Sequence, residues 1–218
     1  MERKNKNDKI TRCYTFNIRA SKDEKEKGVI EGRAIVYNSR TNLGYFDEII
    51  AKGALKKTDL KDVRFLVNHN TDMIPLARSR NNNENSTMQL TVDDEGLKIR
   101  VELDIENNSD ARNLYSAIER GDITGMSFMF TIREEKWEDE DTDHPTRIIL
   151  EIEKVFEVSA VTFPAYEETE INARCKTELE SYRRTLESVK RNGSLESDSD
   201  NLDTLELLKI KNQILGGV

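Results

Sequence analysis

The sequence predicts an α+β fold, with a mainly antiparallel, barrel-like β core flanked by a few helices and followed by a helical C-terminal tail. Three observations predict it. Alternating apolar and polar residues fill most of residues 11–173, charged or turn-forming runs separate these segments, and helical spacing is confined to a few short stretches. Many short strands with few helices favour a closed or nearly closed sheet over repeated β–α–β units.

The first expected strand is RCYTFNIRA, where Tyr14, Phe16 and Ile18 alternate with polar residues. The charged run SKDEKEKG connects it to VIEGRAIVYN, which predicts a first hairpin.

Two further hairpins are expected. MQLTV, the turn DDEG and LKIRVELD form the second, with one apolar face made of Leu97, Ile99, Val101 and Leu103. MSFMFTIREEKW and RIILEIEKV form the third across the acidic loop EDEDTDHPT, and KVFEVSAVTF continues from it.

Two short helices interrupt the strands. One is predicted over DEIIAKGAL, with Asp47 as its N-cap. The other is SDARNLYSAIERG, where Ser109 or Asp110 caps the start and Gly121 ends the helix.

The two ends of the chain differ from this core. Residues 1–10 form a basic extension, and residues 174–218 form a tail of helices and linker. The tail begins with the amphipathic CKTELESYRRTLESVKR, continues through the flexible linker NGSLESDSDN and ends in DTLELLKIKNQIL. A coiled-coil partner, self-association and packing on the core are all open for these helices.

Composition excludes several classes of protein. The chain has 218 residues, 36% hydrophobic and 35% charged, and a net charge of −8. No apolar run is long enough to span a bilayer, and the N-terminus lacks the apolar segment of a secretory signal. The net charge argues against a general nucleic-acid binder but leaves a local basic patch open, and we expect no specific nucleic-acid partner. Cys13 and Cys175 form no metal-binding or disulfide pattern, so we expect a reducing compartment, no metal and no cofactor.

One of the two histidines lies at the end of the apolar run VRFLVNH. Strand alternation places His69 on the face of Val63, Phe65 and Val67. Two interpretations are open. His69 is a core histidine bonded to backbone carbonyls, or it is a general base, since imidazole exchanges protons near neutral pH. His144, in the acidic loop, is expected to be solvated.

Two other polar residues lie in apolar strand patterns. In TGMSFMF, both faces are apolar, so Ser127 is expected to be buried or to line a cleft. Its hydroxyl either bonds locally or acts as a nucleophile, which requires a base such as His69. In EKVFEVSAVTFPAY, Glu157 shares a face with Val155 and Ser159.

A buried carboxyl group should be paired or neutral, because burial of an unpaired charge costs several kcal/mol. The partner of Glu157 is either an arginine or backbone amides, or it is the ring N–H of His69. In the second case Ser127, His69 and Glu157 form a nucleophile–base–acid triad, an arrangement defined by geometry and not by order in the chain.

The chain resembles the prohead (capsid maturation) proteases of tailed bacteriophages, serine peptidases related in fold to the herpesvirus assemblins. The resemblance covers residues 12–173. The segments that carry it, in the order of the family, are GRAIVYN, FDEIIAKGAL, LVNHN with IPLAR, GDITGMSFMF and FEVSAVTFPAY. It implies an assemblin-like core and a protease domain at residues 11–173.

By this resemblance His69 matches the catalytic histidine, Ser127 the nucleophile and Glu157 the third, acidic member. Arg78 becomes a candidate to stabilise the oxyanion, a role that backbone amides can also fill. The chain departs from the family at Ala77, where relatives often have glycine.

The resemblance also implies a task. The enzyme cleaves scaffold, or the scaffold-like arm of the major capsid protein, inside an assembling prohead in the host cytoplasm. It also implies self-processing, for which the exposed tail linker is the expected site, and a homodimer is possible. The rivals are a non-catalytic assembly or scaffold-binding protein, and an esterase or amidase, although the chain lacks a Gly-x-Ser-x-Gly elbow.

Overall fold

The computed structural model describes residues 9–14, 18–22, 28–162 and 179–188. The chain divides into two compact units, residues 1–172 and 173–218, and each is described by itself. In the second unit residues 179–188 form a helix, as the amphipathic pattern predicts. The expected linker at 192–201 and the expected last helix at 203–215 lie outside the described residues. No helix within the described ranges is long and apolar enough to cross a membrane.

The first unit is built mostly of β-strands, with one helix among its described residues. The strands are β1 (Ile10–Tyr14), β2 (Arg19–Lys22), β3 (Gly28–Val36), β4 (Arg40–Asn42), β5 (Asp47–Ile50), β6 (Asp62–Val67), β7 (Ala77–Arg80), β8 (Met88–Val92), β9 (Gly96–Leu103), β10 (Gly125–Glu138) and β11 (Thr146–Val161). The helix α1 covers Ser109–Glu119. Together with the helix at 179–188, this is the α+β class that the sequence predicts.

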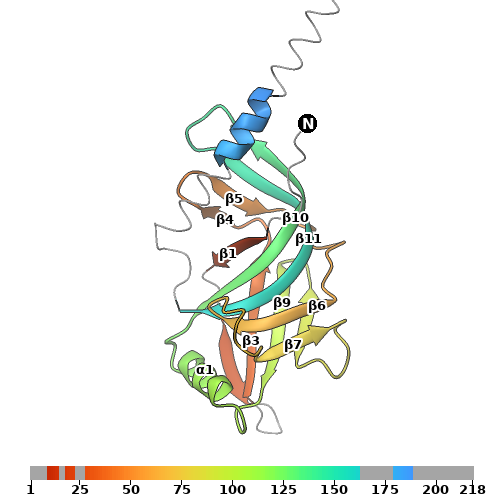
Figure 1. Cartoon of the computed structure of the whole chain (residues 1–218), viewed down its shortest axis with the longest axis vertical. Helices are drawn as coiled ribbons and strands as arrows, with labels where there is room; N and C mark the ends of the chain where they lie inside the picture. Colours follow the sequence, from red (N-terminus) through yellow and green to blue (C-terminus); the bar gives the residue numbers. More distant parts are fainter. Residues whose placement is uncertain (1–8, 15–17, 23–27, 163–178, 189–218) are drawn as a thin grey trace, which may run out of the picture. The chain divides into compact units, whose positions relative to one another are not determined.

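The strands form two sheets, which are mainly antiparallel. A four-stranded sheet has the order β2-β3-β9-β8. In the seven-stranded sheet β11 pairs with β10 along one edge, while its other edge pairs with β5 near its start and with β6 near its end, both in parallel. Figure 1 shows β10 and β11 as one long curved hairpin, with β6 and β7 beside it. The described strands form no single closed barrel, so the barrel-like description of the core stays a prediction.

The hydrophobic core lies between the two sheets. One cluster of buried side chains includes Leu97 and Ile99 from the four-stranded sheet, and Phe128 and Val158 from the seven-stranded sheet. One face of each sheet is therefore buried against the other, and the opposite face of the β10–β11 pair is available for polar groups.

The second and third predicted hairpins are present, and the first is present in part, because each depends on residues that are close in sequence. β2 pairs with β3, β8 with β9, and β10 with β11, all antiparallel. The prediction that residues 12–20 form a single strand is wrong. β1 and β2 belong to different sheets, and the chain passes from one sheet to the other between them.

Helix α1 matches its prediction except for the capping residue. Asn108, and not Ser109 or Asp110, is the N-cap, and its side chain accepts hydrogen bonds from the backbone N–H groups of Asp110 and Ala111. At the other end Gly121 has φ +79° and donates its N–H to the carbonyl of Ile118, as expected of a glycine that ends a helix.

The helix predicted over DEIIAKGAL is wrong. Residues 47–50 form β5, which is held on both edges by β4 and β11, so pairing within the sheet overrides the local helical pattern. Tight turns follow, in which N–H groups bond to carbonyls three residues earlier, and Gly53 has φ +89°.

A buried ion network holds β1 and β5 in this sheet. The guanidinium of Arg12 makes two bonds to Glu48, of 2.6 and 3.0 Å, and both residues are buried. Arg147 reaches the same carboxylate at 3.5 Å and also bonds to Glu135. These pairs link β1 to β5, β5 to β11 and β11 to β10, and loss of one partner would leave a buried charge uncompensated.

Candidate active site

His69 lies in a turn that follows β6. Asn68 and His69 both have left-handed backbone, with φ of 50° and 57°, a conformation that Asn and His adopt more readily than most residues. Asn68 is held by the end of β11. Its N–H donates to Ala160 O at 2.9 Å, and its side chain exchanges bonds of 3.0 and 2.9 Å with Thr162. The prediction that His69 continues the alternation of β6 is therefore wrong, because the strand ends at Val67 and the turn directs the ring.

The ring of His69 contacts the carboxylate of Glu157. His69 Nδ1 lies 2.6 Å from Glu157 Oε1, and the two side chains are 19% and 4% exposed. An ionised carboxylate can only accept hydrogen bonds. In a neutral ring paired with it, Nδ1 therefore carries the proton and Nε2 is the basic nitrogen. The expectation that buried Glu157 has a partner is confirmed. Among the described residues its partners are the imidazole of His69 and the hydroxyl of Ser159, and not an arginine.

A β-bulge explains why Glu157 and Val155 lie on opposite faces of β11. Met129 pairs with Glu157, but the next residue, Phe130, pairs with Val155, so Phe156 is an extra residue on β11. The bulge returns Val155 to the hydrophobic core. The prediction that Val155 shares the face of Glu157 is wrong for this reason.

Ser127 lies near the start of β10, which pairs there with β1 on one edge and with β11 on the other. Its neighbours Met126 and Phe128 belong to the core, so Ser127 points to the opposite face of the sheet. Its partner on β11 is Ser159, which lies two residues from Glu157 on that face. Paired residues have Cβ atoms about 4.5–5.5 Å apart. The nucleophile candidate and the carboxylate therefore share one face of adjacent strands.

Ser127 is fully buried, as the sequence predicts. It is 0% exposed, and its hydroxyl donates to the carbonyl of Arg12 at 2.7 Å. This bond joins β10 to β1, the strand that the Arg12–Glu48 ion pair holds in place.

Arg78 is engaged by a carboxylate. It lies on β7, where it pairs with Arg64 of β6, and its guanidinium makes bonds of 2.6 and 2.9 Å to Asp62. The hydrogen bond from Arg78 lowers the pKa of Asp62 and outweighs the opposing effect of burial. The oxyanion role of Arg78 stays a prediction. It requires the guanidinium to bind the oxyanion in addition to the carboxylate of Asp62.

Ser159 is a site residue that the sequence analysis does not single out. Its hydroxyl contacts both Glu157 and the backbone N–H of His69. The sequence feature that could have identified Ser159 is its position two residues after Glu157 in a strand, because this spacing places both side chains on one face. Asn68 is the other missed residue, and its signal is an asparagine directly before the histidine at the end of a strand.

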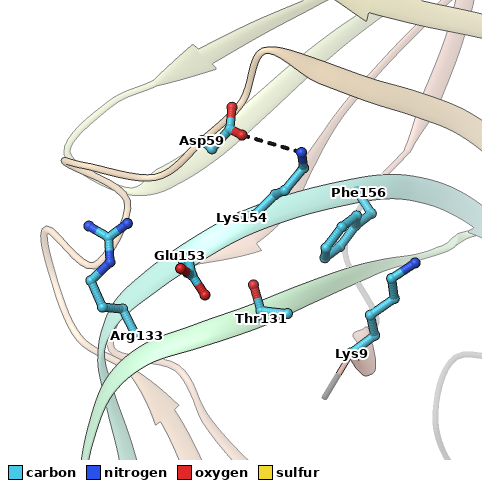
Figure 2. Close-up of a pocket in the computed structure, with 7 residues that line it drawn as sticks. All are labelled: Lys9, Asp59, Thr131, Arg133, Glu153, Lys154 and Phe156. Atoms are coloured by element: carbon cyan, nitrogen blue, oxygen red, sulfur yellow. Dashed lines mark ion pairs between the residues drawn. The ribbon is translucent and has the colours of Figure 1, made fainter. Parts of the chain in front are cut away.

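A pocket of about 450 Å³ lies along the same strand pair. Figure 2 shows Thr131 on β10 beside Lys154 and Phe156 on β11, with Lys154 paired to Asp59 at 3.3 Å. The ammonium of Lys9 lies 4.5 Å from the centre of the Phe156 ring. The pocket is thus a polar depression whose cations have partners, and its lining does not include the three triad candidates. Among the described residues, no three His, Cys, Asp or Glu side chains are grouped to hold a metal ion.

Comparisons with known proteins show which proteins this chain is similar to. The family model described as caudovirus prohead serine protease matches residues 15–185. The prohead protease of Enterobacteria phage HK97 is 32% identical over 152 residues, which cover 68% of this chain and 60% of that protein. The solved structure of the bacteriophage T4 capsid assembly protease is similar with a TM-score of 0.42 and 13% identity, covering 70% of this chain and 96% of that one. This chain spans only about 60% of the length of the HK97 relative. Because the family match extends over well more than half of its residues, the chain belongs to the caudovirus prohead serine protease family.

Proposed function

We propose that this chain is a serine endopeptidase of prohead maturation, which cleaves scaffold or the scaffold-like arm of the major capsid protein and also processes itself. One observation carries the proposal. Nδ1 of His69 lies 2.6 Å from the buried carboxylate of Glu157, at the sheet face that also carries Ser127. In a family of serine proteases, this contact supports the assignment of base and acid.

The proposed reaction is acyl transfer. His69 Nε2 takes the proton of Ser127 as Oγ attacks the carbonyl carbon of the scissile peptide bond. The C–N bond of the tetrahedral intermediate then breaks, and the imidazolium gives its proton to the leaving amine. A water molecule, deprotonated by the same ring, releases the acyl group and restores the serine. Glu157 keeps the proton on Nδ1 and stabilises the imidazolium.

The hydrogen bond of Ser127 adds one step to this reaction. A hydroxyl has a single proton to donate, and here Ser127 donates it to the carbonyl of Arg12. Attack therefore requires the hydroxyl to turn from β1 towards His69.

Two other functions make different predictions. A non-catalytic assembly protein with a protease-like fold binds capsid or scaffold subunits but does not react with a fluorophosphonate. An esterase or amidase reacts with the probe but does not cleave capsid protein. The His69–Glu157 contact favours catalysis over simple binding, because a buried acid–imidazole pair prepares a base at Nε2.

Substitution of the nucleophile tests the proposal. Ser127→Ala is expected to lower the cleavage rate of capsid or scaffold protein by a factor on the order of 10⁶, and to abolish fluorophosphonate labelling. Intact mass spectrometry provides a second measurement. Wild-type protein should lose the tail near residues 192–201, and the alanine variant should keep its full mass.

The matched control is Ser79→Ala. Ser79 is a buried serine on β7 whose hydroxyl has no hydrogen-bond partner among the described residues. This variant should be labelled, cleave its substrate and shorten as wild type does. If Ser127→Ala cut the substrate at a rate comparable with wild type, Ser127 would not be the nucleophile.

A further inference from the structure

Ser159 makes two hydrogen bonds at the candidate active site. It is 0% exposed on β11, directly opposite Ser127 on β10. Its hydroxyl donates to Glu157 Oε2 at 2.5 Å, and the same oxygen accepts the backbone N–H of His69 at 3.2 Å. One side chain thus contacts both members of the acid–imidazole pair.

These contacts close a ring of hydrogen bonds. Glu157 uses Oε1 for the ring of His69 and Oε2 for Ser159, so both carboxylate oxygens have partners and the plane of the carboxylate is set. The last torsion of a glutamate side chain is otherwise broad. The bond from the His69 backbone to Ser159 also fixes the turn that carries the ring. The direction of the Nδ1–H bond therefore depends on Ser159, which contacts the carboxylate of Glu157 and the backbone of His69.

We propose that Ser159 is the positioning residue of the acid–imidazole pair, a role that rests on the proposed function for its effect on catalysis. Without the hydroxyl, Glu157 Oε2 and the His69 N–H each lose a partner in a buried environment. The carboxylate can then rotate, and the ring can exchange its Nδ1–H form for the Nε2–H form. The Nε2–H form has no basic nitrogen to offer to Ser127, so the fraction of competent enzyme falls.

The pair Ser159→Thr and Ser159→Val provides a matched test, because threonine and valine have nearly the same shape and differ by the hydroxyl. Ser159→Val and Ser159→Ala are expected to lower kcat by about 10- to 100-fold with little change in KM, as for the loss of a hydrogen bond to a charged group. Ser159→Thr should retain most of the wild-type kcat. Loss of folding alone would affect threonine and valine alike.

A second measurement does not depend on activity. The chain has two histidines, so ¹⁵N NMR of the histidine side chains in the Ser127→Ala background gives two ring systems, which His144→Gln assigns. We expect the Nδ1–H form of His69 in the parent, a mixture of forms in Ser159→Val and Ser159→Ala, and restoration in Ser159→Thr. The ring signals of His144 should not change.

The kinetic and NMR measurements distinguish failure of the positioning role from failure of the proposed function. If His69 keeps its Nδ1–H form in Ser159→Val and Ser159→Ala, the positioning role is wrong, even when Ser127→Ala shows that the protein is a serine protease. If Ser127→Ala retains activity, the proposed function fails, and the NMR comparison still decides whether Ser159 orients the pair.

Discussion

Both histidines of this chain contact a carboxylate, and the two pairs differ in burial. His69 lies 2.6 Å from Glu157, with side chains 19% and 4% exposed. His144 lies 2.9 Å from Asp47, with side chains 39% and 14% exposed. The expectation that His144 is the solvated histidine agrees with this difference. A short distance between imidazole and carboxylate therefore does not by itself mark a catalytic pair.

The other partners of the two carboxylates differ more than the distances do. Asp47 also bonds to Arg40 at 2.8 Å, so a permanent cation already compensates its charge. The second partner of Glu157 is the neutral hydroxyl of Ser159. Within the part of the chain that the structure describes, His69 is the one basic side chain paired with Glu157. A buried and uncompensated carboxylate stabilises an imidazolium strongly, because the low local dielectric screens it little.

The largest expected effect is the difference in cleavage activity between substitutions of His69 and of His144. His69→Gln should lower kcat/KM for capsid-protein cleavage by a factor on the order of 10⁶, as loss of the base does in a well-studied serine protease. His144→Gln should stay close to the wild-type rate, since its ring lies in an exposed loop between β10 and β11. Equal losses in the two variants would remove the distinction between the pairs.

The next largest effect is the difference in kcat between substitutions of Glu157 and of Asp47. Glu157→Gln keeps the size of the side chain but removes its charge, so kcat should fall by roughly 10³- to 10⁴-fold. Asp47→Asn is the matched change at the other pair, and its kcat should remain close to wild type. Steady-state cleavage of one peptide substrate by both variants measures the contrast. A near-normal kcat in Glu157→Gln would show that the carboxylate does not assist the base.

The features that depend on residues close together in the chain can be predicted from the sequence. The β10–β11 hairpin follows from strand alternation, and the helix α1 follows from its helical spacing and terminating glycine, although its N-cap is Asn108 and not a predicted residue. The need for a partner at Glu157 follows from the cost of a buried charge. Resemblance to a family then adds the roles of His69 and Ser127.

The parts that depend on distant strands cannot be predicted in this way. Alternation places His69 on a strand, but bonds from Asn68 to the end of β11 form a turn there instead. A bulge at Phe156 changes the face of Val155. Residues 47–50 pair with β11 and become a strand. Each of these predictions is wrong where pairing between distant strands determines the backbone conformation. The local sequence pattern does not indicate which strands pair.

The smallest expected effect concerns the pH dependence of stability at the exposed pair. Burial acts to raise the pKa of Asp47, but hydrogen bonds from Arg40 and His144 outweigh it, and the pKa is lowered from its ordinary value. A carboxylate with a lowered folded-state pKa stabilises the fold above its unfolded pKa of about 3.9, and this contribution is lost as the pH falls through the folded value. Urea unfolding should therefore show Asp47→Asn to be less stable than wild type at pH 5–7 by under about 1 kcal/mol, since Arg40 is largely exposed.

The same difference should shrink towards zero as the pH falls below about 4, because the wild-type carboxyl group then becomes neutral like the amide. Asp94→Asn is a suitable control, because Asp94 pairs with Lys52 at 2.9 Å but its side chain is 91% exposed. That control should show almost no difference at any pH. Asp47→Asn could instead remain destabilised by the same amount down to pH 2. The asparagine would then disturb packing, and the charge of Asp47 in the His144–Asp47 pair would contribute nothing to the free energy of unfolding.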